Sequence, residues 1–532
     1  MSFRVLVADS LAPEGLDAVA HVEALEVDNR KGIEREELLG CIHEYDALVV
    51  RSRTQVDAEL LALGTRLKVV GRAGIGIDNI DLKSATQQGV IVMNTPDGNA
   101  VTTAEHTVSM MMAASRLIPQ ATASMKAGRW EKKKFMGREL SGKTLGVVGL
   151  GNIGRIVSDR AQGLKMKVVG YDPFFTAEAA QRIGVEFLPL EEVLSKADVL
   201  TVHTPLTEQT RGLVSDAQIE RMKPGVLLIN CARGGIYDEQ ALVRGLESGK
   251  VGAVALDVFV EEPPPADHPL LSHERVICTP HLGASTAEAQ VNVAVAVLEQ
   301  IADYATGEPA RNGLNLPRLS QAELREVAPY LDLAQRLGSF VGQIGQGAFK
   351  KIEIVLHGEM ADMNAAPIAT AALSGALGNT LSSPVNPVNA RLIAEQRGVE
   401  IVESTARTLG AGSLASGMTV RIESETVNTV SGTLFAQGEG RIVEINDIRL
   451  EAVPDGHMLL ICNRDMPGAV GKIGTVLGRA GVNISRMQLG LGKEGGDALA
   501  VVNIDGAVPD SVLTELHGIE QVVSVDSVGL HV

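Results

Sequence analysis

The stretch LGVVGLGNIGRI, which begins at Leu145, constrains the fold of this chain more than any other. Gly149, Gly151 and Gly154 follow an apolar run and precede a helical pattern, in the order G-x-G-x-x-G. The first glycine permits a tight turn, the second lets the backbone approach a pyrophosphate, and the third lets the helix pack on the strand. The free N–H groups and the dipole at the start of such a helix favour that negative charge. The stretch therefore predicts a βαβ unit that binds a dinucleotide.

An acidic residue follows at the end of the next predicted strand. Asp172 closes the run KMKVVGYD. A carboxylate there can accept a hydrogen bond from a ribose 2′-hydroxyl and would repel a 2′-phosphate, so we expect NAD rather than NADP as the cofactor. A glycine-rich turn without any ligand is the alternative, but strand, glycines, helix and acid fall in the order that a dinucleotide site requires.

Two parts of the chain alternate short apolar runs with helical patterns. From residue 1 to about 98, and again from 143 to about 283, runs rich in Val, Ile and Leu predict parallel strands that are buried on both faces. Between these parts, Thr102 and Glu105 form a capping-box pattern at the start of a long buried helix. We expect an α/β fold with two doubly wound parallel-sheet domains of the Rossmann type.

The C-terminal part of the chain has a different pattern. Residues 318 to about 452 suggest strands and turns of an α+β domain and carry no recognisable chemistry. From His457 the pattern is β-α-β-β-α-β, which predicts a ferredoxin-like domain. The expected domains are residues 1–98 with 284–315, then 99–283, 316–452 and 456–532.

Composition narrows the classes of function. With a formal net charge of −17 and 3% aromatic residues, the chain lacks the basic footprint and exposed rings of a nucleic-acid-binding protein. The N-terminus does not resemble a signal peptide, and no apolar run approaches the roughly 18 residues of a membrane span, so we expect a cytoplasmic protein. The four cysteines form no CxxC pair, which predicts neither a metal site nor disulfides. Cys231 and Cys278, at the ends of apolar runs, should be buried thiols.

Three residues after the glycine motif could serve substrate chemistry beside a nicotinamide. Arg233, in NCARGG, follows an apolar strand, and its guanidinium could clamp a carboxylate in bidentate fashion. His281, in TPHLGAST, stands among small residues that leave room for a cofactor and a substrate. Its imidazole, with an ordinary pKa of roughly 6.5, suits the exchange of an alcohol proton. A carboxylate behind the ring would fix its tautomer, and Asp257 and Glu262 are both candidates.

The residues alone leave the identity of the base open. His203, in VLTVHTPL, lies at another strand end and is a rival to His281, whereas His106 lies within a helical stretch. Spacing does not choose between His203 and His281. A lone arginine or histidine at a strand end is also often a surface ion pair or a satisfied structural group.

Four ordered motifs, LGVVGLGNIG, NCARGG, DVFVEEP and TPHLGAST, resemble the D-isomer-specific 2-hydroxyacid dehydrogenases over residues 1 to about 315. In that family an Arg, a Glu and a His in these motifs are catalytic, which implies Arg233, Glu262 and His281. The resemblance also implies a substrate-binding domain at residues 1–98 with 284–315 and an NAD-binding domain at 99–283. The implied NAD contacts at the pyrophosphate are Gly149, Gly151, Asn152, Ile153 and Gly154. Asp257 is implied at the nicotinamide carboxamide. The other implied NAD contacts are Asp172, Thr204, Cys231, Ala232, Arg233, His281, Leu282, Gly283 and Ala284.

Further stretches, VVRSRT, VVGRAGIGIDNID and MNTPDGNAVTTAEH, resemble the branch of this family that oxidises 3-phospho-D-glycerate. The resemblance implies substrate contacts from Arg51, Ser52, Arg53, Gly74 and Asn99. The run Lys132, Lys133 and Lys134 could add charge for a phosphate, or it could be a solvated face. Two alternatives remain, namely a glyoxylate or hydroxypyruvate reductase of the same family and, from another class, an NAD-sensing corepressor.

Longer members of the family carry an intervening domain and a C-terminal ACT domain, which matches the length and the final pattern of this chain. In some members serine binds the ACT domain and inhibits, and the matching positions are Asn463, Asp465 and Asn483. Some serine-inhibited members have Tyr or His where this chain has Asn463, so the effector is serine or another small molecule. The resemblance further implies a homodimer or homotetramer. Because the chain crosses between the first two domains near residues 98 and 284, we expect the cleft between them to close on the substrate.

Overall fold

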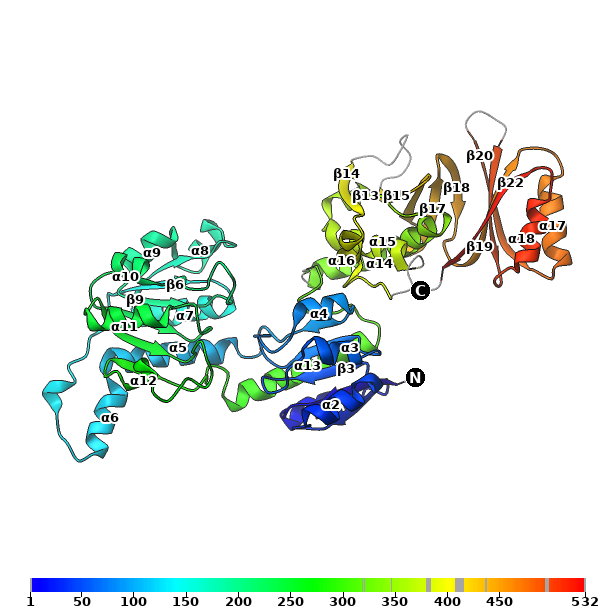
Figure 1. The fold of residues 1–532 in the computed structure, drawn as a ribbon. Helices are drawn as coiled ribbons and strands as arrows, with labels where there is room; N and C mark the ends of the chain where they lie inside the picture. Colours follow the sequence, from blue (N-terminus) through cyan, green and yellow to red (C-terminus); the bar gives the residue numbers. More distant parts are fainter. Residues whose placement is uncertain are drawn as a thin grey trace.

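The computed structural model describes residues 2–530 apart from 318, 320, 346, 379–383, 407–415, 436–437 and 493–496. Figure 1 shows four units that each contain a sheet. The N-terminal unit, in blue, lies in the middle of the view, with the cyan and green unit on its left and the two C-terminal units, in yellow and red, on its right. We refer to them as the first to fourth units in order of sequence.

The first unit is a parallel sheet in the order β2-β1-β3-β4-β5. Its strands are β1 (Phe3–Val7), β2 (Leu25–Asn29), β3 (Ala47–Val50), β4 (Val69–Arg72) and β5 (Ile91–Met93). Its helices are α1 (Pro13–Val19), α2 (Arg35–Cys41), the 3₁₀ turn Ile42–Glu44, α3 (Ala58–Leu63), α4 (Leu82–Gln87) and α13 (Ala287–Ala305), which returns from the second unit. All of β3 is buried, as expected of a continuous apolar run. The sequence analysis missed β2, because this edge strand is only half-buried and has no such run.

The second unit is a larger parallel sheet in the order β12-β11-β10-β9-β6-β7-β8. Its strands are β6 (Thr144–Val148), β7 (Lys167–Tyr171), β8 (Glu186–Phe187), β9 (Val199–Val202), β10 (Val226–Asn230), β11 (Val251–Leu256) and β12 (Val276–Cys278). Its helices are α5 (Ala100–Arg116), α6 (Ile118–Lys126), the 3₁₀ turn Lys132–Lys134, α7 (Asn152–Gly163), α8 (Ala177–Arg182), α9 (Leu190–Lys196), α10 (Asp216–Arg221), α11 (Glu239–Glu247) and α12 (Pro269–Ser272). The strand order reverses between β6 and β9, which is the switch point where such sheets bind ligands.

Two local predictions in this unit are wrong. Helix α5 begins at Ala100 after Asn99, so Thr102 lies inside the first turn and does not cap it. The Thr102 hydroxyl instead lies 3.3 Å from that of Thr286, which links the two chain crossings. Cys231 is buried as expected, but Cys278 is exposed, because it closes the short strand β12 at the edge of the sheet.

The third unit packs helices against a mixed sheet in the order β14-β13-β15-β16-β17-β18. Its elements are α14 (Gln321–Ile344), β13 (Lys351–Gly358), the 3₁₀ turn Glu359–Asp362, α15 (Ala365–Gly378), α16 (Ala390–Gln396), β14 (Glu400–Ala406), β15 (Ser416–Glu423), β16 (Val427–Leu434), β17 (Gly440–Ile445) and β18 (Ile448–Ala452). Among the described strands of this sheet, only β13 and β14 pair in parallel. Helix α15 is buried nearly all round, so its sequence lacks the amphipathic period that would have revealed it.

The fourth unit confirms the predicted β-α-β-β-α-β pattern. Its elements are β19 (Gly456–Arg464), α17 (Ala469–Arg479), β20 (Ile484–Leu491), β21 (Asp497–Ile504), α18 (Asp510–His517) and β22 (Val522–Leu530). The antiparallel sheet has the order β20-β21-β19-β22. One face of this sheet packs under its own helices, while Met458, Leu460 and Val501 on the other face join the core of the third unit. Within the part of the chain that the structure describes, no helix is long and apolar enough to span a membrane.

Candidate active site

The glycine motif forms the tight connection from β6 to α7. A Cβ atom on Gly149 would lie 2.5 Å from the His203 carbonyl oxygen, and one on Gly154 would lie 2.0 Å from the Gly149 carbonyl oxygen. Both glycines are therefore required by close backbone packing, and Gly149 also has φ +94°. Gly151, at the N-cap of α7, faces open space. The turn thus leaves room for a phosphate group at the start of the helix.

Polar groups around this turn fit a dinucleotide. Asp172, at the end of β7, accepts hydrogen bonds of 2.8 Å from the N–H groups of Leu150 and Phe174, which hold its carboxylate beside the glycine turn. The Thr204 hydroxyl and the Asn99 side-chain oxygen are buried and have no partner among the described residues. A bound ligand could satisfy both groups, and a buried polar atom without a partner otherwise carries a free-energy cost. Asn152 donates to Asp97 at 2.7 Å, and Ile153 follows it in the first turn of α7.

The remaining predicted cofactor contacts lie on the loops after β10 and β12. Burial raises the pKa of Cys231 to about 12, so this thiol is neutral. The Ala232 N–H donates to the Asn230 side chain at 2.9 Å. Leu282 and Gly283 donate their N–H groups to Asp257. The Ala284 carbonyl accepts a hydrogen bond of 3.3 Å from Gln290.

His281 and Glu262 form a direct pair, in which Nδ1 lies 2.7 Å from Oε2. The hydrogen bond with Glu262 raises the pKa of His281 despite partial burial of the ring. Burial acts to raise the pKa of Glu262, but its hydrogen bonds with His281 and with the Phe259 N–H outweigh burial, so the pKa lies below its ordinary value. Because Nδ1 is engaged by the carboxylate, Nε2 is the ring nitrogen that can face a substrate.

Asp257 supports the loop that carries His281 and does not bond to its ring. The buried carboxylate accepts hydrogen bonds from the Thr279 hydroxyl at 2.5 Å and from two N–H groups of the following loop. The sequence analysis gave no function to His106, whose Nε2 lies 3.1 Å from Asp257. Burial acts to raise the pKa of Asp257, but the hydrogen bonds from His106 and Thr279 outweigh it, and the pKa is lowered. The signal available in the sequence was a histidine within a long helical stretch whose other face is apolar.

His203 differs from His281 in its surroundings. Burial lowers the pKa of His203 to about 4, so its ring is neutral at physiological pH. Its Nε2 lies 3.1 Å from the Thr201 hydroxyl, within the sheet. Such a ring is a poor proton carrier, which favours His281 as the acid–base group.

Arg233 joins the first and second units. Its Nε donates to the Asp78 carboxylate at 2.9 Å, and Nη1 donates to the Ala232 carbonyl at 2.6 Å. A Cβ atom on Gly76 would lie only 1.6 Å from Arg233 Nη2, so the guanidinium lies directly against this loop of the first unit. Neither Asp78 nor Gly76 was predicted, although both lie in the motif GIGID.

A second partly buried cation, Arg72, lies beside Arg233. Burial and the charge of Arg233 lower the pKa of Arg72 to about 10, and its Nε has no partner among the described residues. A Cβ atom on Gly74 would lie 1.7 Å from Arg72 Nη1, so a larger residue there would displace this guanidinium. The sequence analysis assigned no role to Arg72.

The other predicted substrate residues are more exposed. The Arg51 N–H donates to Asp9 at 2.6 Å, and its guanidinium donates to a carbonyl at 3.3 Å. Arg53 forms an exposed ion pair of 3.0 Å with Glu34, and Ser52 between the two arginines is exposed. The lysine run Lys132–Lys134 is also exposed.

The predicted effector residues lie on the fourth unit. Asn463, at the end of β19, is buried, and its side-chain oxygen has no partner among the described residues. Asp465 lies in the exposed turn that follows. Asn483 donates to Asp505 at 2.8 Å. In the described residues, no group of three or more His, Cys, Asp or Glu side chains could hold a metal ion.

Comparisons with known proteins agree with this architecture. The NAD-binding domain of the D-isomer specific 2-hydroxyacid dehydrogenases matches residues 108–283, which contain the glycine turn, Arg233 and the His281–Glu262 pair. The intervening domain of D-3-phosphoglycerate dehydrogenase matches residues 326–446, and an ACT domain matches residues 457–521. A glyoxylate reductase structure from Paecilomyes thermophila is 29% identical, with a TM-score of 0.54, over 59% of this chain and 98% of its own.

Full-length relatives define the family more narrowly. The D-3-phosphoglycerate dehydrogenase of Archaeoglobus fulgidus is 41% identical over 99% of this chain and 100% of its own length. That of Bacillus subtilis is 42% identical over 99% of this chain and 100% of its own. The chain therefore belongs to the D-3-phosphoglycerate dehydrogenases, and its cofactor is NAD.

Proposed function

We propose that this site oxidises 3-phospho-D-glycerate to 3-phosphohydroxypyruvate with NAD, which is the first step of L-serine biosynthesis. The observation that carries the proposal is the His281–Glu262 pair, with 2.7 Å between the nitrogen and the oxygen, on the same domain as the glycine turn. Full-length similarity to D-3-phosphoglycerate dehydrogenases supports the phosphorylated substrate.

In the proposed mechanism His281 takes the proton from the substrate hydroxyl through Nε2. Glu262 stabilises the imidazolium that forms, because its carboxylate already bonds to Nδ1. Bound NAD supplies the hydride acceptor, so the alcohol carbon loses a hydride as its oxygen loses a proton. Arg233 holds the substrate carboxylate and the developing carbonyl. To do so, its guanidinium must either bind Asp78 and the substrate together or break its hydrogen bond with Asp78.

The phosphate is proposed to bind Arg51, Ser52 and Arg53. The ion pair of Arg53 with Glu34 is exposed, so exchanging the carboxylate for a phosphate should cost little. Partly buried Arg72 adds positive charge beside Arg233. The run Lys132–Lys134 is a further candidate for phosphate contact.

Serine or another small effector is proposed to bind the ACT domain at Asn463, Asp465 and Asn483. A homodimer or homotetramer and a cytoplasmic location stay predictions.

The testing experiment compares 3-phosphohydroxypyruvate, hydroxypyruvate and glyoxylate as substrates with NADH, and then replaces NADH by NADPH. We expect kcat/KM for the phosphorylated substrate to be higher by a factor of about a hundred or more, which is about 2.7 kcal/mol of discrimination. Equal or better rates with glyoxylate would point to the reductase alternative, for which Arg51→Ala and Arg53→Ala would hardly matter. Binding of NADH without turnover of any substrate would point to the corepressor.

A further inference from the structure

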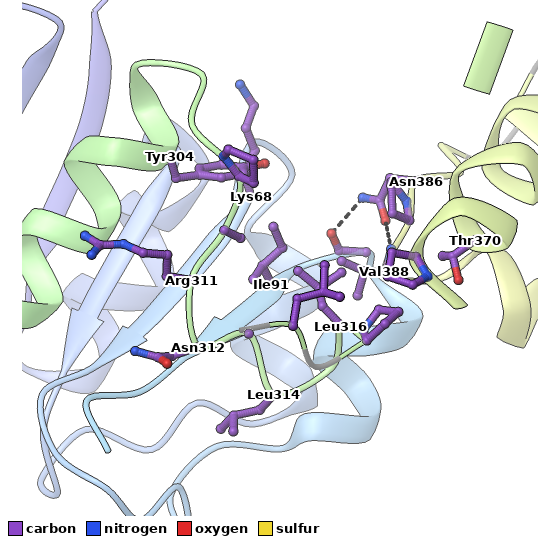
Figure 2. A pocket seen from close by; sticks show the side chains of 18 of the residues that line it. Lys68, Ile91, Tyr304, Arg311, Asn312, Leu314, Leu316, Thr370, Asn386 and Val388 are labelled. Carbon is purple, nitrogen blue, oxygen red and sulfur yellow. Dashed lines mark hydrogen bonds between the residues drawn. The ribbon is translucent and has the colours of Figure 1, made fainter. Parts of the chain in front are cut away.

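A large cavity lies between the first and third units, away from the candidate active site. Its volume is about 1260 Å³, and Figure 2 shows it from close by. Its walls come from the loops around β4 and β5, from the connection at residues 309–317 with Leu319, and from α14, α15 and the segment before α16. Arg233, Glu262 and His281 do not line it. We call it the interdomain cavity.

One wall of the interdomain cavity is a firm contact between units. Asn386 donates from its side chain to the Gly89 carbonyl at 2.7 Å, and its side-chain oxygen accepts from the Val388 N–H at 2.9 Å (Figure 2). Val388 belongs to the same apolar core as Ile91 of the first unit. The cavity is therefore bounded by residues that are held in place on both sides.

The interior combines an apolar middle with a positively charged end. Ile91, Leu316 and Val388 lie in the middle, and Lys68, Tyr304 and Arg311 lie at one side (Figure 2). Further apolar lining comes from Leu67, Leu314, Leu319, Leu324 and Leu331. An apolar lining with a few placed polar groups is typical of small-molecule sites.

The charged end has more positive than negative charge. Arg66 and Lys68 share the single buried carboxylate of Asp46, at 2.9 and 3.5 Å. Arg311 pairs with Asp303, yet its Nε is buried without a partner among the described residues. A carboxylate in the cavity would meet this excess positive charge while its hydrocarbon body lies on the leucines.

We propose that the interdomain cavity binds an amphipathic organic anion, with an aliphatic body and a carboxylate head, as an inhibitory effector. This site is separate from the ACT residues Asn463, Asp465 and Asn483. Its volume exceeds the roughly 300–1,000 Å³ of ordinary ligand pockets, so a long aliphatic body fits.

Two lining residues connect the cavity to the candidate active site. Asn94 donates from its side chain to the Ile75 carbonyl at 2.7 Å, on the loop that carries Asp78 and its bond to Arg233. Asp97 accepts a hydrogen bond of 2.7 Å from Asn152, in the first turn of α7. This segment is also one of the two chain crossings. A ligand that restrains it slows the relative motion of the first and second units, and so lowers kcat.

The test uses the full-length protein as purified, with octanoate, decanoate and dodecanoate as probes at monomeric concentrations. Isothermal titration calorimetry without substrate measures binding, so its outcome does not depend on the proposed reaction. We expect one site per chain, with affinity rising about fourfold for each added methylene group that is buried. Decanol, which has a similar chain without the charge, should bind at least about fivefold more weakly than decanoate. In the NADH assay decanoate should lower kcat without competing with the substrate.

Variants locate the binding site. Lys68→Met removes one cation while Arg66 still pairs with Asp46, and Leu316→Gln places an amide in the apolar middle. Each should weaken decanoate binding by about fivefold or more, whereas Lys196→Met, which removes an exposed lysine paired with Glu186, should not. Unchanged binding in both cavity variants, inhibition that competes with the substrate, or a cavity closed by a second copy of the chain would each overturn the proposal.

Discussion

Replacing Glu262 by Gln keeps the size of the side chain and removes its charge from His281. The glutamate accepts from Nδ1 at 2.7 Å, so it fixes the proton on that nitrogen and raises the pKa of the ring. Glutamine can donate as well as accept, so it also permits the tautomer in which Nε2 carries the proton. We therefore expect Glu262→Gln to lower both the pKa of His281 and the population of the reactive tautomer.

The expected magnitude follows from the exposure of the pair. General acid–base catalysis contributes about 10²–10⁴-fold. The His281 and Glu262 side chains are 48% and 39% exposed, so water screens their interaction more than in a buried triad. We expect kcat to fall by about a hundredfold, at the lower end of that range. The KM for NADH should change little, because the glycine turn is untouched.

The pH profile gives the direction of the effect. In the oxidation of 3-phosphoglycerate the neutral ring is the base, so kcat/KM falls as the pH drops through the His281 pKa. Lowering that pKa moves the acid limb to lower pH. In the reduction the imidazolium is the acid, and the limb at high pH should also move to lower pH.

The assay measures kcat and kcat/KM in both directions across pH, with Glu261→Gln as the matched control. Glu261 is the exposed neighbouring glutamate, and its replacement should leave both limbs in place. If Glu262→Gln behaves like Glu261→Gln, with the same kcat and the same limbs, the assigned role of Glu262 is refuted.

Three further predictions concern positions fixed by close contacts. Gly154→Ala places a methyl group 2.0 Å from a carbonyl oxygen of the turn, so calorimetry should show NADH binding at least about tenfold weaker, whereas Gly163→Ala in open space on the same helix should leave it unchanged. His106→Leu removes a hydrogen-bond partner of the buried Asp257, so the KM for NAD should rise and kcat should fall, each by about tenfold. His106→Gln can still donate a hydrogen bond to Asp257 and should recover most of this loss. Equal defects in the two variants would contradict a positioning role for His106. Gly89→Ala should lower the free energy of unfolding, measured with denaturant, by about 2 kcal/mol more than Gly398→Ala. Both glycines have positive φ, but only the methyl group at position 89 would meet side chains, those of Asn386 and Asn389 in the third unit. Equal losses of stability would contradict the contact between Gly89 and the third unit.

Local sequence patterns predicted the glycine turn and most of the parallel strands, whereas the roles assigned to the site residues stay predictions. The spacing of Gly149, Gly151 and Gly154 specified a dinucleotide turn, because close backbone packing requires glycine at the first and third positions and the second leaves open space for a phosphate. The apolar runs specified the parallel strands, and the alternating pattern after His457 specified the fourth unit. Where the sequence alone left two candidate bases, burial of His203 and the carboxylate beside His281 distinguish them.

Other features depend on contacts between distant segments, which a single sequence does not reveal. Arg233 meets Asp78 across 155 positions of sequence, and Arg72 lies beside it because Gly74 leaves space for its guanidinium. His106 bonds to Asp257 from a helix whose pattern showed only burial.

The sequence by itself determined most strands of the two parallel sheets, the pattern of the fourth unit and where the cofactor turn lies, because short-range sterics and hydrophobic periodicity act along neighbouring residues. Only the tertiary structure decided which carboxylate faces His281 and that an apolar cavity with a charged end lies between the first and third units. Glu262 lies 19 positions from His281, and Asn386 meets Gly89 across 297 positions, so both outcomes depend on packing between segments that are not neighbours in sequence. The free energy of such packing is not encoded in any local pattern.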